Sequence, residues 1–370
     1  MSNIVGIQTP HYASNYGAQL QAFALGRAIK ELGYDIEYIN RRPSYFYEHS
    51  NVIDRFFKSL ELKTRMKGFI EFEKLYLQPQ SKLLIHNKDY STLDVSKYKA
   101  IVVGSDQIWR DDYFYHSFEY SPYLFFFKSG ATKKISYAAS FGKNTCNPPE
   151  ERRQRIEELL KDFNAISLRE KSGVDILKET YNADGVWVAD PTLLHNKEYY
   201  VKTLNLTESA NPIIVTYILG ASSAAMQKLN GISKKMHLPL DHIYKKSNKW
   251  WMYKRPFSTL AKYKSVPSVF EWLNKILSAE YVITDSFHGM CFSIIFHKQF
   301  IVINNKAGGS ERFLSLLSKL GLTDRLLEWT ASDKQIMTKL EEQIDYESVD
   351  TQKLQFTGHS ISFLKDAIKK

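Results

Sequence analysis

Short apolar runs rich in β-branched residues alternate with longer helical segments along most of this 370-residue chain. The stretch 279–304 shows the pattern most clearly. Its run 281–284 is typical of a buried parallel strand, and the polar turn 285–289 is rich in residues that cap helices. An apolar helix is expected at 290–296 and a further strand at 300–303. Strand, loop, helix and strand in this order predict the βαβ unit of parallel sheets.

The same alternation occurs in both halves of the chain, which is long enough for two domains with separate cores. It predicts an α/β fold with two Rossmann-like domains facing a cleft. We expect an N-terminal domain over residues 1–195, a C-terminal domain over 196–345 and a last helix over 346–370, with a linker at 196–211. The predicted strands are 4–7, 35–39, 99–103, 134–140, 165–168 and 186–189 in the first domain, and 212–219, 240–244, 281–284 and 300–303 in the second.

Residues 41–98 interrupt this alternation with an aromatic and basic segment whose apolar residues have helical spacing. We interpret it as a helical insertion that packs on the sheet of its own domain. The alternative is an apolar face that rests on a partner or a membrane interface. The residues of that face are Phe56, Phe57, Leu60, Phe69 and Phe72.

Polar residues follow several of the predicted strands. In open α/β sheets, ligands bind at the carboxyl ends of strands, beside helix N-termini. Side chains of Asp and Gln can bond sugar hydroxyls, and Trp offers a ring face, so we expect a saccharide-binding surface in the N-terminal domain. The loop after the first strand, which carries Asn15, Tyr16 and Gln19, lacks the GxGxxG dinucleotide fingerprint. The alternative for this loop is an ordinary turn followed by a helix cap. The candidates are Asn15, Tyr16, Gln19, Asp106, Gln107 and Trp109.

Composition limits the kinds of ligand or surface that the protein is expected to bind. The formal net charge is +10, but the basic residues are scattered and no nucleic-acid motif occurs, which favours small anions or an anionic membrane surface over nucleic acid. The cysteines, Cys146 and Cys291, lack metal-ligand spacing. The N-terminus does not resemble a secretory signal, and no apolar run reaches 18 residues. We therefore expect a cytoplasmic protein.

Seven segments in chain order carry a family resemblance. Together they resemble the polysaccharide pyruvyl transferase family over about residues 3–327. The segments are NYGAQLQAFAL at 15–25, VVGSDQIWR at 102–110, ISYAASFG at 135–142, ISLREKSGVDIL at 166–177, VADPTLL at 188–194, VITDSFHGMCFSIIF at 282–296 and GGSERFLSLLSKLGLTDRL at 308–326.

The resemblance implies a glycosyltransferase-B-like fold and the transfer of the pyruvyl group of phosphoenolpyruvate onto two hydroxyls of one sugar. The products are a cyclic ketal and phosphate. Acceptors in the family are cell-surface glycans or their lipid-linked precursors, so peripheral contact with the inner membrane face is expected. No metal or other cofactor is implied, since phosphoenolpyruvate is the donor substrate.

Phosphoenolpyruvate is highly anionic, so its site needs fixed cations and N–H donors. The resemblance identifies His288 as the catalytic acid/base. Many members carry an arginine two residues before this histidine, whereas this chain has Ser286. We expect other cations to compensate, with Arg169 and Arg312 first. The predicted phosphoenolpyruvate-binding residues are Arg169, Arg312, Ser286, Gly309, Ser310 and Lys246.

Two other functions remain open at this point. One is a glycosyltransferase of the same fold that uses a nucleotide-sugar donor. The other is a non-catalytic glycan-binding relative, which the missing arginine suggests.

Overall fold

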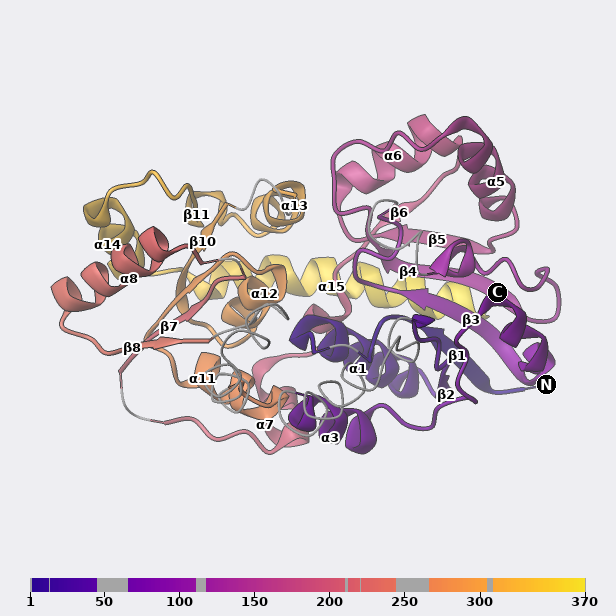
Figure 1. Ribbon diagram of the computed structural model, residues 1–370, viewed down its shortest axis with the longest axis horizontal. Helices are drawn as coiled ribbons and strands as arrows, with labels where there is room; N and C mark the ends of the chain where they lie inside the picture. The colour runs from indigo at the N-terminus through magenta and orange to yellow at the C-terminus, as the bar shows by residue number, and fades with distance from the viewer. Residues whose placement is uncertain are drawn as a thin grey trace, which may run out of the picture.

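Two parallel β-sheets, each flanked by helices, form the protein (Figure 1). The computed structural model describes residues 2–12, 14–44, 66–110, 118–209, 212–219, 221–243, 266–304 and 309–369. The strands of the first sheet lie between residues 4 and 187, and those of the second between 214 and 327. The prediction of an α/β fold with two Rossmann-like units is thereby confirmed.

The first sheet has the order β2-β1-β3-β4-β5-β6, and all of its pairings are parallel. Its four inner strands are apolar and almost wholly buried, as expected of strands covered by helices on both faces, whereas the edge strands β2 and β6 are partly exposed. The strands of this sheet are β1 (Ile4–Gln8), β2 (Asp35–Tyr38), β3 (Tyr98–Gly104), β4 (Lys133–Ala139), β5 (Ala165–Leu168) and β6 (Val186–Trp187). The helices of this unit are α1 (Tyr16–Glu31), α3 (Lys67–Tyr76), α5 (Glu150–Leu160) and α6 (Lys171–Tyr181).

The second sheet has the order β11-β10-β9-β7-β8 and is also parallel. Its strands are β7 (Ile214–Tyr217), β8 (Leu240–His242), β9 (Tyr281–Thr284), β10 (Gln299–Ile303) and β11 (Leu326–Leu327). The helices that follow the first unit are α7 (Lys197–Leu204), α8 (Ser223–Met236), α11 (Val269–Ser278), α12 (Phe287–Ile295), α13 (Glu311–Lys319), α14 (Asp333–Glu341) and α15 (Tyr346–Lys369).

Each sheet reverses its strand order at one point, between β1 and β3 in the first and between β7 and β9 in the second. Loops diverge there and leave room for a ligand. In the second sheet the Asp285 carboxylate accepts a hydrogen bond from the Leu219 N–H at 2.6 Å and joins the loops that follow β9 and β7. The predicted 285–289 turn therefore lies at this reversal point.

The predicted linker at 196–211 contains a regular helix, α7, and the sequence reasoning also missed α14 and β11. Asn196 caps α7 by accepting a hydrogen bond from the Tyr199 N–H at 2.9 Å. All three elements are short, so few apolar residues repeat at a fixed period within them. The secondary structure of such short segments depends more on tertiary contacts than on the spacing of their apolar residues.

The described part of the 41–98 insertion packs against α1 through α3, and its residues Gln80 and Leu84 form parallel bridges with Tyr38 and Arg41 at the edge of the first sheet. Phe69 and Phe72 of α3 are buried, with Phe69 4.8 Å from the Tyr16 ring and Phe72 5.8 Å from the Phe23 ring. These two residues therefore belong to the core. Phe56, Phe57 and Leu60 lie outside the described residues.

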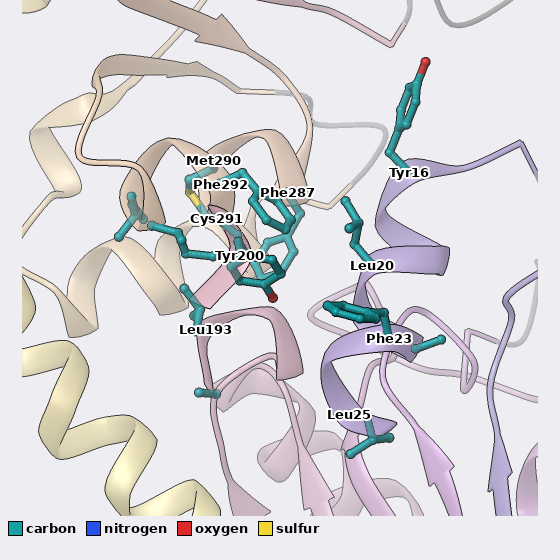
Figure 2. Packing of buried hydrophobic residues seen from close by; sticks show 14 of the residues in the cluster. Tyr16, Leu20, Phe23, Leu25, Leu193, Tyr200, Phe287, Met290, Cys291 and Phe292 are labelled. Carbon is teal, nitrogen blue, oxygen red and sulfur yellow. The ribbon is translucent and has the colours of Figure 1, made fainter. Parts of the chain in front are cut away.

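One hydrophobic cluster joins the two units, in addition to a cluster within each. The expectation of two separate cores is therefore wrong in one respect. Helix α1 is buried on nearly all sides, because one side faces its own sheet and the other faces the second unit. Figure 2 shows its residues Leu20 and Phe23 on one side and Phe287 and Phe292 of α12 on the other, with Tyr200 alongside.

Helix α15 runs from the second unit back across the first (Figure 1). Its Ser360 is fully buried, accepts a hydrogen bond from the Ala189 N–H at 2.9 Å and donates one to the Phe356 carbonyl at 2.7 Å. The helix therefore secures the segment that follows β6. Among the described helices, none has both the length and the apolar character that crossing a membrane requires.

We expect Ser360→Ala to lower the free energy of unfolding by about 1–3 kcal/mol, because it leaves the buried Ala189 N–H without an acceptor. Urea denaturation followed by circular dichroism measures this. Thr351→Ala is the matched control, since Thr351 is exposed on the same helix and donates only to the Glu347 carbonyl. Equal stability of the two variants would contradict the role given to Ser360.

Candidate active site

Helix α12 places His288 at the end of the second sheet, and the preceding turn is held by side-chain hydrogen bonds. Thr284 donates to the Tyr217 carbonyl at 2.7 Å and accepts from the Ser286 N–H at 3.0 Å. Ser286 caps the helix by accepting from the Gly289 N–H at 3.4 Å. A Cβ on Gly289 would lie 2.4 Å from the Thr284 hydroxyl, so only glycine allows this tight turn.

Asp190 is the centre of a buried polar cluster at the end of the first sheet. Its Oδ2 accepts from the Ser105 hydroxyl at 2.8 Å and from Arg169 Nη1 at 3.1 Å. Its Oδ1 accepts from the Thr192 N–H at 3.0 Å and from the Thr192 hydroxyl at 2.7 Å. His288 Nε2 lies 3.7 Å from Asp190 Oδ2, which is too long for a hydrogen bond but close enough for a charge interaction.

These contacts determine the charge of the Asp190 carboxyl. Burial alone would raise its pKa, but the interactions with His288, Arg169 and the Thr192 N–H hold that pKa well below its ordinary range. Asp190 is therefore ionised at neutral pH. A fixed anion thus lies beside the imidazole of His288, although Asp190 follows a strand of the first sheet and His288 lies in a helix that follows a strand of the second.

The Arg169 guanidinium has N–H donors that Asp190 does not use. Its Nη1 is occupied by Asp190, while Nε and Nη2 make no hydrogen bond to the residues that the structure describes. Nε is 3.8 Å from Glu170 Oε2, and Nη2 is 4.0 Å from Asp106 Oδ1. Burial lowers the pKa of Arg169, but Asp190, Glu170 and Asp106 more than offset this and raise it. The guanidinium is thus a permanent buried cation.

A second guanidinium lies in the same region. Arg169 is 4.5 Å from the centre of the Phe287 ring, and Arg312 is 6.0 Å from it. Burial and the charge of Arg169 lower the pKa of Arg312 to about 10, which still leaves it cationic at neutral pH. Two partly desolvated like charges repel each other, and an anion bound between or beside them would offset that repulsion.

The two units meet directly at His288. A Cβ on Gly17, in the first turn of α1, would lie 2.0 Å from His288 Nδ1. The imidazole therefore occupies space that any other residue at position 17 would fill. The NYG segment of the first unit and the histidine of the second unit form one surface.

A second close approach joins the loops beside the site. Gly309 has a φ of 89°, and a Cβ there would lie 2.0 Å from the Gly142 carbonyl oxygen. The Gly142 loop is itself held by buried Glu170, which accepts from the Gly142 N–H at 3.0 Å and from the Ser140 hydroxyl at 2.8 Å. Ser310 does not point to a free anion site here, because its hydroxyl donates to Asn304 Oδ1 at 2.7 Å.

Three of the predicted acceptor residues are buried in packing roles. The Tyr16 ring stacks on Trp272 with 5.0 Å between centroids, and its hydroxyl donates to the Pro267 carbonyl at 2.7 Å. Gln19 donates to two backbone carbonyls, including that of Phe69 at 3.0 Å. Trp109 is 1% exposed and stacks on Tyr123 at 5.4 Å, so its ring face is not available to a sugar in this structure.

The three remaining acceptor candidates lie nearer to the cluster. Asn15 caps α1 and accepts from the Ala18 N–H at 3.4 Å. Asp106 is partly exposed, has a φ of 74° and forms the long ion pair with Arg169. The Gln107 side chain lies against Gly142, where a Cβ would be 2.3 Å from Gln107 Oε1. Lys246 lies outside the described residues.

Three residues of the cluster are not among the predicted site residues, namely Asp190, Glu170 and Gly17. A signal was available for two of them. Glu170 directly follows Arg169 at the end of a strand, and Asp190 ends the next strand, so both fall at the edge where ligands bind.

Comparison with known proteins supports this fold. The chain is similar to TagF, a wall teichoic acid polymerase solved with CDPG, at 11% identity and a TM-score of 0.50, over 99% of this chain and 88% of that chain. It is also similar to UDP-GlcNAc 2-epimerase from Methanocaldococcus jannaschii in complex with UDP-GlcNAc and UDP, at 12% identity and a TM-score of 0.50, over 95% of this chain and 98% of that chain. These similarities confirm a glycosyltransferase-B-like fold.

Sequence comparison identifies the family. A search of curated proteins finds no match. The sequence model of the polysaccharide pyruvyl transferase family matches residues 15–307, which include Arg169, Asp190 and His288. Because this match spans most of the chain, the protein belongs to the polysaccharide pyruvyl transferase family.

Proposed function

We propose that the protein transfers the pyruvyl group of phosphoenolpyruvate onto two hydroxyls of one sugar, in the biosynthesis of a cell-surface polysaccharide or its lipid-linked precursor. The observation that carries this proposal is the buried cluster of His288, Asp190 and Arg169, with Arg312 beside it. It combines a group that can move protons with two cations that can hold an anionic donor.

The reaction needs proton transfers and charge stabilisation. A proton added to C3 of the enol phosphate makes C2 electrophilic, and the first sugar hydroxyl forms a C–O bond there. The C2–O bond to phosphate breaks, and the second hydroxyl completes the ketal. Of the two hydroxyl protons, one ends on the new methyl group and the other on phosphate.

His288 is the residue proposed to move these protons. Histidine titrates near neutral pH and can act as acid and as base in one cycle. A helix N-terminus disfavours a positive imidazolium. The ionised Asp190 carboxylate, 3.7 Å from Nε2, offsets this effect, and a bound anionic donor would add to it. Asp190 therefore acts as a positioning residue for the charged form of His288.

Arg169 and Arg312 are proposed to hold the carboxylate and phosphate of the donor. Charge-assisted hydrogen bonds from guanidinium groups suit both anions. Ser286, which stands where many relatives carry an arginine, caps α12 and supplies no cation. The guanidiniums that lie 4.5 Å and 6.0 Å from the neighbouring Phe287 ring compensate for that absence. A lipid-linked acceptor would bring this +10 protein to the anionic inner face of the membrane.

The direct test incubates the protein with phosphoenolpyruvate and a panel of lipid-linked oligosaccharides. Phosphate release that depends on the acceptor, together with a mass gain matching a pyruvyl ketal, is expected. A parallel panel of nucleotide sugars tests the glycosyltransferase alternative. Glycosyl transfer from a nucleotide sugar, with no reaction of phosphoenolpyruvate, would reject the proposal.

We expect Arg312→Ala to raise the KM for phosphoenolpyruvate about tenfold to a hundredfold, because a charged hydrogen bond contributes about 1.5–3 kcal/mol. Steady-state phosphate release measures this. Arg169→Ala has the same direction but also unpairs the buried Asp190, so Arg169→Lys accompanies it and thermal unfolding checks both variants. Arg155→Ala, an exposed position on α5, is the control. Wild-type KM values for both arginine sites would contradict their proposed role.

We expect Gly17→Ala to reduce kcat about a hundredfold, comparable with the 10²–10⁴-fold contribution of a general acid/base. The new methyl group would displace the His288 imidazole, although alanine favours a helix by about 1 kcal/mol over glycine. Gly358→Ala is the matched control, since nothing lies within 4 Å of that position. It should gain stability and keep full activity. Full activity of Gly17→Ala would show that the contact with His288 is not required.

A further inference from the structure

The loop of residues 189–192 carries Asp190 and continues past the pairing of the first sheet. The pairing of β6 with β5 extends to the Val188 N–H, which donates to the Leu168 carbonyl at 2.9 Å. The loop beyond that point is buried, so its backbone N–H and carbonyl groups need other partners. Side-chain hydroxyls are the partners of three of these groups.

Three fully buried hydroxyls bond this loop from three different elements. The Tyr137 hydroxyl of β4 donates to the Ala189 carbonyl at 3.2 Å, and the Ser360 hydroxyl of α15 accepts from the Ala189 N–H at 2.9 Å. The Tyr200 hydroxyl of α7 donates to the Thr192 carbonyl at 2.9 Å. The loop is therefore fixed on both sides of the residue that carries the buried carboxylate.

The two tyrosine hydroxyls are donors and not bases. Burial, with a further contribution from the charge of Asp190, raises the pKa of Tyr137 and that of Tyr200 well above the ordinary value. Both hydroxyls therefore remain protonated near neutral pH and donate to the loop carbonyls. Their effect on the site is an effect on the geometry of the loop.

Strand β4 has an extra residue where it passes the site. Its register with β5 shifts before Ala139, and Ala138 has a φ of 52°, in a region that residues with a side chain seldom adopt. Such bulges are common beside active sites, where they redirect side chains. Tyr137, on one side of the bulge, bonds the 189–192 loop, and Ala139, on the other, accepts the Arg169 N–H at 3.0 Å. One short segment thus holds the loop and the backbone of a proposed donor-binding residue.

A movement of the loop would change the surroundings of the proposed acid/base. Asp190 Oδ2 lies 3.7 Å from His288 Nε2 and 3.1 Å from Arg169 Nη1. A misplacement of about 1 Å, even one caused far from the chemistry, can slow an enzyme about a hundredfold. Loss of one hydroxyl leaves the other two in place, so we expect a smaller loss of about tenfold.

We propose that these three hydroxyls position the loop for the reaction and so act on His288 through Asp190. The positioning residues are Tyr137, Tyr200 and Ser360. The inference rests on the proposed function, because it assigns the hydroxyls to the catalytic step of that reaction. It gives α7 and α15 a part in catalysis, although α15 follows the end of the family match at residue 307. A purely structural role, in which the hydroxyls only satisfy buried backbone groups, is the alternative.

The test compares Tyr137→Phe and Tyr200→Phe with Tyr38→Phe. Tyr38 is the matched control, because it is 1% exposed and its hydroxyl donates to the Ala22 carbonyl of α1 at 3.2 Å. Phosphate release with phosphoenolpyruvate and lipid-linked oligosaccharides gives the kinetics, and thermal unfolding gives the stability. The first two variants should lower kcat about tenfold and keep the KM for phosphoenolpyruvate within about twofold. Tyr38→Phe should keep the wild-type kcat at a similar loss of stability.

A second measurement does not depend on the proposed donor. The imidazole signals of His288, identified by comparison with His288→Gln, are followed by NMR in the full chain without added substrate. They should move in Tyr137→Phe and Tyr200→Phe and stay unchanged in Tyr38→Phe. If one of the first two variants fails to fold, Ser360→Ala takes its place with the same expected results.

The outcomes separate this inference from the proposed function. Equal kcat in the three tyrosine variants, or unchanged His288 signals in Tyr137→Phe and Tyr200→Phe, would overturn the positioning role. An absence of phosphate release by wild type would reject the proposed donor reaction. The His288 signals alone would then decide whether the hydroxyls act on this histidine.

Discussion

The buried carboxylate of Asp190 is the interaction on which the site depends. It is almost fully buried, and it is tolerated there because Ser105, Thr192 and Arg169 supply hydrogen bonds and charge. Removing one member of such a group leaves an uncompensated charge or donor in the interior. The ends of three strands and the start of α12 are therefore held in one arrangement by a single side chain.

Sequence periodicity predicts most of the architecture, but not the short elements α7, α14 and β11 or the core that the two units share. The apolar runs of parallel strands are distinct from amphipathic helices, so the strands from β1 to β10 can be located from the order of residues alone. Position at a strand end also identifies Arg169, Asp106 and His288. The same rule cannot separate a polar residue that faces a ligand from one that faces the core. Tyr16 and Gln19 follow a strand as the site residues do, yet Tyr16 faces the second unit and Gln19 bonds the backbone carbonyls of His11 and Phe69.

Gly17 and Asp190 show that residue spacing alone does not predict every residue of the candidate site. Gly17 lies in a loop where a ligand could be met, but the sequence does not show that a histidine 271 positions later in the chain lies against it. Asp190 precedes Pro191 and has the composition of a turn. Its role becomes visible only when β3 to β6 lie in one sheet, which brings Ser105 and Arg169 to the same carboxylate.

The hydrogen bond from Ala189 to Ser360 has a consequence for the order in which the chain is made. Domains fold largely from the N-terminus as synthesis proceeds. Ala189 is adjacent to Asp190, but its N–H must wait for an acceptor that is synthesised 171 residues later. The segment around Asp190 therefore reaches its final hydrogen bonding only after α15 has left the ribosome. A nascent chain with both sheets formed therefore still lacks the acceptor of one buried N–H directly beside the site.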